Sequence, residues 1–140
     1  MTPGWITPPH ELFLAKSAPY LAPKSNRAQL REEFEKQGAR VWDVDIGPTR
    51  SLLEFFAEFR RVVRLPEWCA YGWDSLYDAF EELRANNEFP MALLIVGLRD
   101  LLDSSTHLGL EVVLRLEELT TALSTRGDQM VVIYLGDLWS

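Results

Sequence analysis

The sequence has few of the residues that build metal and nucleophilic sites. Its one cysteine, Cys69, excludes an internal disulfide and fits a reducing compartment. Its two histidines, His10 and His107, have no second His or Cys ligand nearby, whereas a zinc site needs three or four ligands. The eight glycines are scattered and form no phosphate-binding loop, and no GxSxG motif is present. We therefore expect no metal and no cofactor.

Long apolar runs are also absent. No stretch approaches the roughly 20 apolar residues that a membrane-spanning helix needs. The first residues, MTPGWITPPHELF, lack the basic region and apolar run of a signal peptide. We therefore expect a cytoplasmic protein with no membrane partner. At 140 residues the chain is long enough for one domain with a substantial core.

Positive charge is scarce, and negative charge is concentrated. The net charge of −7 disfavours nucleic-acid binding, which depends on Lys and Arg, and suits a basic protein partner. Residues 65–90 contain Arg84 as their single Lys or Arg, against the acids Glu67, Asp74, Asp78, Glu81, Glu82 and Glu88. This concentration favours an electrostatic interface, although a solvated helix face also explains it.

The N-terminal part predicts few regular elements. Residues 11–15 suit a short strand, and prolines interrupt residues 18–23. The pair Ser25-Asn26 is an N-cap candidate for a helix over residues 27–37, which Gly38 ends.

Clearer patterns follow from residue 39. They predict strands at 39–46, 91–96 and 130–135, a helix capped by Thr49 that runs to 63, and helices at 73–85 and 110–126. The last helix has an apolar stripe of Leu110, Val112, Val113, Leu116, Leu119 and Leu123. Residues 99–105 suit either a short helix or a turn. Strands separated by helices predict an α/β fold with a small parallel sheet and right-handed crossovers.

The helix predicted at 73–85 has two chemically different faces. Leu76, Phe80 and Leu83 form an apolar stripe, and Asp74, Asp78 and Glu81 lie on another side with Tyr77. Carboxylates four residues apart repel by about 0.2–0.5 kcal/mol, so water or a cationic partner must offset the repulsion. An acid–base pair for catalysis is the weaker interpretation, because two acids on one helix turn point outward and form no cleft.

This stretch also resembles a known family. Leu65-Pro66-Glu67, followed by Trp73-Asp74-Ser75-Leu76-Tyr77-Asp78, resembles the barstar family of small bacterial proteins that inhibit barnase-type ribonucleases. The resemblance covers roughly residues 40 to 137. It implies about three parallel strands covered by helices in a domain at 39–140. An N-terminal extension, 1–38, would pack on this domain and could add a fourth strand at an edge of the sheet.

The resemblance also implies a function and a site. In that family an acidic helix and the loop before it fill a ribonuclease active site, with carboxylates in place of substrate phosphate. Asp78 matches the residue that enters the pocket most deeply. The residues expected at the interface are Trp68, Trp73, Asp74, Tyr77, Asp78, Glu81 and Glu118. The residues alone allow other interpretations. Trp68 could equally cover the core, and Tyr77 could equally lie on the helix surface without a partner. Asp74 could serve to stabilise the N-terminus of the helix.

Two positions depart from the family pattern. The loop has Ala70-Tyr71-Gly72 where the family has Gly-x-Asn, and Ala122 stands where the archetype has a late glutamate. Glu118, one turn earlier, is the candidate replacement. The expected protein is a monomeric, non-enzymatic immunity protein against a basic, secreted bacterial ribonuclease. The alternatives are a similar inhibitor of a different toxin and a regulatory interaction module.

Overall fold

A computed structural model describes residues 6–14, 17–66, 69, 72–86 and 88–136. Four parallel strands form one sheet in the order β1-β4-β3-β2. The strands are β1 (Tyr20–Pro23), β2 (Arg40–Asp45), β3 (Met91–Val96) and β4 (Met130–Gly136). The helices are α1 (Arg27–Lys36), α2 (Leu52–Val63), α3 (Trp73–Ala85), α4 (Leu98–Ser104) and α5 (Thr106–Thr125), with 3-10 turns η1 (His10–Leu12) and η2 (Lys24–Asn26). The predicted α/β fold with a parallel sheet and an N-terminal edge strand is confirmed.

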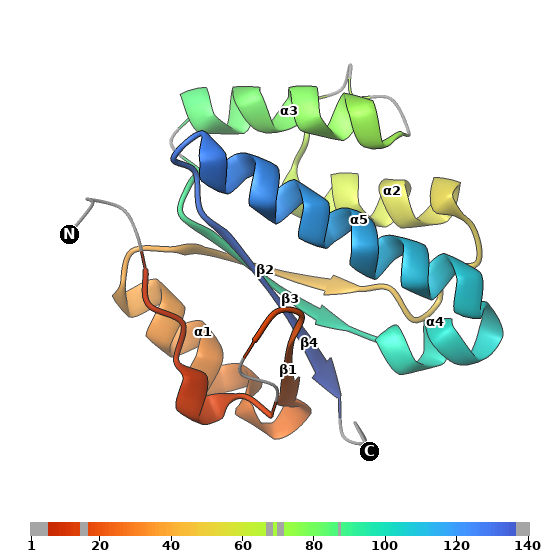
Figure 1. The fold of residues 1–140 in the computed structure, drawn as a ribbon, viewed down its shortest axis with the longest axis horizontal. Helices are drawn as coiled ribbons and strands as arrows, with labels where there is room; N and C mark the ends of the chain where they lie inside the picture. Colours follow the sequence, from red (N-terminus) through yellow and green to blue (C-terminus); the bar gives the residue numbers. More distant parts are fainter. Residues whose placement is uncertain (1–5, 15–16, 67–68, 70–71, 87, 137–140) are drawn as a thin grey trace.

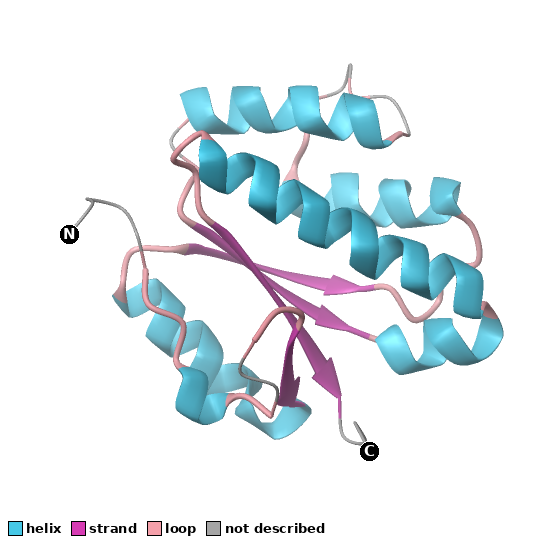
Figure 2. Ribbon diagram, in the orientation of Figure 1, coloured by secondary structure: helices cyan, strands magenta, loops and turns pink. Residues whose placement is uncertain are grey.

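Helices cover both faces of this sheet (Figures 1 and 2). α2, α3 and α5 lie over one face, and α4 lies at the carboxyl end of the strands. Alternate residues of β4, such as Val132 and Tyr134, are buried beneath these helices with Leu93 and Ile95 of β3. Burial on both sides explains why the two central strands are continuous apolar runs. None of the described helices is long and apolar enough to cross a bilayer.

The N-terminal part covers the other face. Ala92, Leu94, Val131, Ile133 and Leu135 point away from α2, α3 and α5 into a second apolar cluster. The residues that bury them are Ile6, Phe13, Ala22, Leu30, Phe34 and Ala39. Residues 6–39 therefore complete the core of the sheet.

The N-terminal strand lies later in the chain than predicted. Residues 10–12 form the 3-10 turn η1, and the strand is β1, in the stretch that its prolines were expected to break. β1 pairs with β4 alone, from Tyr20 opposite Ile133 to Pro23 opposite Gly136. An edge strand tolerates proline because one side of its backbone has no ladder to complete.

Asn26 occupies the N-cap position of α1, as predicted, but makes no capping hydrogen bond, and the predicted cap Thr49 is wrong. The Asn26 side chain donates a hydrogen bond to the Leu12 carbonyl (2.9 Å) and does not cap α1. Thr49 is buried, and its hydroxyl donates to the Ile46 carbonyl (2.6 Å). Ser51 caps α2 instead, where its hydroxyl accepts from the Glu54 N–H (3.2 Å).

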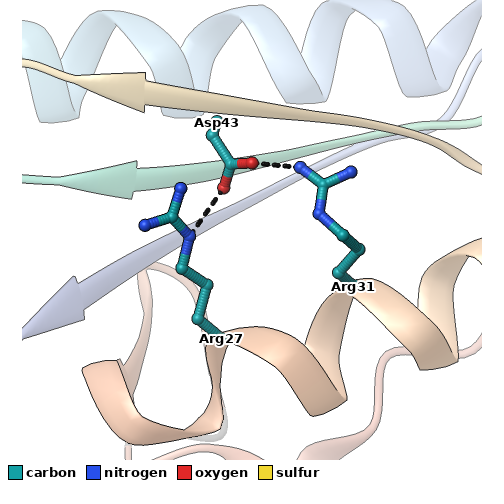
Figure 3. A network of polar contacts seen from close by, with 3 residues as sticks. All are labelled: Arg27, Arg31 and Asp43. Carbon is teal, nitrogen blue, oxygen red and sulfur yellow. Dashed lines mark hydrogen bonds and ion pairs between the residues drawn. The ribbon is translucent and has the colours of Figure 1, made fainter.

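Ion pairs join α1 to the edge strand β2 (Figure 3). Asp43 accepts hydrogen bonds from Arg27, at 3.0 Å, and from Arg31, one turn further along α1. The pairs place a charged, half-buried residue on β2, a feature that also discourages pairing of an edge strand with another chain.

The loops after β2 and β3 meet at Gly97, which lies at φ +90° before α4. A Cβ there would lie 2.6 Å from the Cα of Gly47 and closer still to its nitrogen. At Gly127, φ is +86° but a Cβ would have no atom within 4 Å. Alanine at either position pays the left-handed penalty of about 1–2 kcal/mol.

We expect Gly97→Ala to lower the free energy of unfolding by about 1–3 kcal/mol more than Gly127→Ala, because only Gly97→Ala adds a backbone clash. Urea unfolding of the two variants measures the difference. Equal losses would contradict the close contact of the two loops.

Candidate protein-binding site

α3 directs its acidic side chains outward because its other side belongs to the core. As the apolar stripe predicted, its buried side chains join the core cluster that α2 and α5 share with one face of the sheet. They are Leu76, Ala79, Phe80 and Leu83. Asp74 and Asp78 are exposed, one turn apart. The buried stripe thereby fixes the direction of both carboxylates.

Asp74 and Asp78 differ from several other acids of the protein in that they have no cationic partner among the described residues. Neither makes a hydrogen bond or an ion pair within the described part of the chain. Ion pairs with arginines form at Asp43, Glu58, Glu81, Glu88, Asp103, Glu118 and Asp128. Two neighbouring carboxylates on α3 are thus available to an external cation.

Tyr77 lies between the acids, where α3 runs beside α5. Its ring is half-buried and packs against the core, so it does not lie free along the helix surface. Burial raises the pKa of its hydroxyl, as do Glu118 and Asp74, while Arg115 lowers it. The hydroxyl therefore stays protonated at neutral pH and can donate a hydrogen bond. Glu118 is exposed and 3.6 Å from Arg115.

Trp73 holds the first turn of α3 in place. Its ring packs against Phe55 and Phe56 of α2, with ring centroids 5.5 and 4.8 Å apart. Its indole N–H donates to Glu111 of α5 (3.4 Å). Trp73 of α3 is therefore half-buried against α2 and α5. Glu111, absent from the predicted site, joins it through this tertiary contact, which no sequence spacing reveals.

The remaining predicted residues have different surroundings. Glu81 forms an ion pair with Arg126 at the end of α5, so its charge is already compensated. Trp68 lies outside the described residues. The unpaired part of the predicted site is Asp74 and Asp78, with Tyr77 and Glu118 beside them.

Cys69 lies in the turn before α3 and is buried. Burial raises the pKa of its thiol, Arg60 lowers it and Asp78 raises it, so the Asp78 carboxylate lies near this turn. A raised pKa disfavours the thiolate, the form that acts as nucleophile. Within the described ranges, no three His, Cys, Asp or Glu residues are grouped so that they could hold a metal ion.

The geometry provides an exposed pair of carboxylates on a rigid helix, next to a half-buried tyrosine and a second acidic helix. Such a surface can accept hydrogen bonds from Arg and Lys side chains of a partner. Comparison with protein-family models finds no family that matches this sequence, and comparison with curated proteins finds no match either.

Proposed function

We propose that this protein is a barstar-like immunity protein, a non-enzymatic inhibitor that covers the basic active site of a bacterial ribonuclease toxin. The observation that carries the proposal is the pair Asp74 and Asp78, exposed on one face of α3 without a cationic partner among the described residues. Several other acids of the protein, among them Asp43, Glu88 and Asp128, form ion pairs with arginines. Two uncompensated charges therefore lie side by side where the resemblance puts the ribonuclease.

The chemistry of a ribonuclease pocket suits this pair. Such a pocket holds phosphate with Arg, Lys and His side chains. A carboxylate accepts short, charge-assisted hydrogen bonds from the same groups, and arginine binds it through two parallel bonds. Asp78 would enter the pocket, and Asp74 would bind at its rim.

The helix is also preorganised for binding. Four buried side chains and the contacts of Trp73 fix α3 against α2 and α5. A binding helix that is already ordered loses little conformational entropy in the complex. Two acids on one convex helix face suit insertion into a partner's cleft better than catalysis within a cleft of their own.

The test is inhibition of a barnase-type ribonuclease by the wild-type protein at low and moderate salt. We expect tight inhibition that weakens as salt rises, because the contacts are charged. Asp74→Asn should weaken inhibition, whereas Glu35→Gln should not. Glu35 is an exposed acid on α1, on the opposite side of the sheet from α3. Both substitutions replace a carboxylate by an amide, so they change the net charge by the same amount.

Absence of inhibition at both salt concentrations would contradict the ribonuclease as target. Equal losses from Asp74→Asn and Glu35→Gln would show that net charge alone matters and would contradict a site on α3.

A further inference from the structure

The outward side of α5 has two leucines that the fold leaves uncovered. Leu110 and Leu114 are 53% and 63% exposed, one helical turn apart. Leu110 was predicted in the buried stripe of this helix, but the buried positions are Leu108, Gly109, Val112, Leu116, Leu119 and Leu123. The prediction for Leu110 is therefore wrong, since its side chain lies off the face that meets the sheet.

The two leucines line an open hollow of about 480 Å³ whose other walls are charged. These walls are His107, Glu111, Arg115 and Glu118. Glu111 is 4.0 Å from His107, and Arg115 is 3.6 Å from Glu118. The hollow is thus an apolar strip bordered by two acids, Glu111 and Glu118, which lie beside His107 and Arg115 of the same helix.

One wall of this hollow touches the first turn of α3. Glu111 accepts the hydrogen bond from Trp73, the residue before Asp74. Glu118, in the same hollow, and Asp74 on α3 both raise the pKa of Tyr77, so charges of both helices act on this tyrosine. A partner seated on Asp74 and Asp78 therefore lies next to Leu110 and Leu114.

We propose that the inhibitory surface extends from α3 onto α5, and that Leu110 and Leu114 receive an apolar side chain that the toxin presents beside its basic pocket. This inference rests on the proposed function. The occupant follows from charge. A basic surface is complementary to the unpaired Asp74 and Asp78, whereas a second copy of this chain, with its net charge of −7, would bring like charges together.

The two parts of the surface have different kinetic roles. Exposed carboxylates speed association and make it salt-dependent. Burial of leucine surface is not electrostatic, so it slows dissociation at any moderate salt concentration. The leucines and the aspartates are therefore separable by experiment.

The experiment measures association and dissociation rates of a barnase-type ribonuclease on the immobilised full-length protein, at two salt concentrations. We expect Leu110→Ala/Leu114→Ala to dissociate about tenfold faster or more, with an unchanged association rate and salt dependence. Leu14→Ala is the control, because Leu14 is 58% exposed in the N-terminal segment that covers the opposite sheet face. It should bind like wild type. Both variants should unfold at the wild-type temperature, since the removed atoms are exposed.

Three results would overturn the inference. If wild type binds and the double variant dissociates no faster, the apolar site is wrong and the proposed function stands. If wild type does not bind, the proposed function fails and the apolar site fails with it. If sedimentation shows a wild-type dimer that the double variant abolishes, a second copy of the chain covers the leucines.

Discussion

Replacing Asp78 with alanine is expected to weaken binding of a barnase-type ribonuclease by about 2–5 kcal/mol, the cost of removing one partner from a buried, hydrogen-bonded charge pair. That range is roughly 30-fold to several thousandfold in the dissociation constant. The loss arises because the basic groups of the pocket stay buried without their counter-charge. Titration of ribonuclease activity with each variant, at one fixed salt concentration, measures the effect.

The same substitution should leave the free protein intact. Asp78 is exposed and makes no hydrogen bond or ion pair within the described residues, so the free energy of unfolding should change by less than about 0.5 kcal/mol. Relief of the repulsion from Asp74 favours a small increase. Asp78→Asn keeps the shape of the side chain and separates charge from packing. A large loss of unfolding free energy with unchanged binding would mean that Asp78 stabilises the fold and does not contact the partner.

Removal of residues 1–38 should abolish cooperative folding of the remaining chain. It would uncover Ala92, Leu94, Val131, Ile133 and Leu135, which the N-terminal part now buries. It would also leave β4 as an exposed edge strand, because β1 is its partner on that side. Exposed apolar patches of more than a few hundred Å² and bare strand edges lead to aggregation. Size-exclusion chromatography and urea unfolding of the 39–140 fragment test this.

Point variants provide graded controls for the truncation. Phe34→Ala removes one fully buried ring of α1 and should cost about 3–5 kcal/mol of unfolding free energy. Glu35→Ala, on the exposed side of the same helix, should cost less than about 0.5 kcal/mol. A fragment of residues 39–140 that unfolds cooperatively as a monomer would mean that the N-terminal part is dispensable for the fold.

Local pattern predicts the elements from residue 39 onward because each is strongly periodic or continuously apolar. The runs Met91–Val96 and Met130–Gly136 are buried on both faces. Each can be predicted as a strand from its own residues, without knowing which strands lie beside it. β1 is different. Its four residues include a proline, and it is a strand only because β4 offers a free edge. Asn26 makes no capping bond and Thr49 is not the cap of α2 for a related reason, since each side chain bonds to a carbonyl outside the helix that follows it.

The same distinction applies to the candidate site. Helical spacing predicts that Asp74 and Asp78 share an exposed face, because the spacing is a local property. It does not predict that Glu81 is paired with Arg126, or that Trp73 bonds Glu111, because those partners lie 45 and 38 residues away. Pairing separates the available acids from the compensated ones, and pairing is a property of the tertiary structure.

The strand order has a consequence for synthesis on the ribosome. β1, the first strand, has the last strand as its partner, with Tyr20 opposite Ile133. β1 therefore has no ladder to join until β4, more than a hundred residues later, has left the exit tunnel. Contacts between such distant segments slow folding, because a long loop must close before they form. The four-stranded sheet, and the core face that the N-terminal part covers, can therefore form only after β4 has been synthesised.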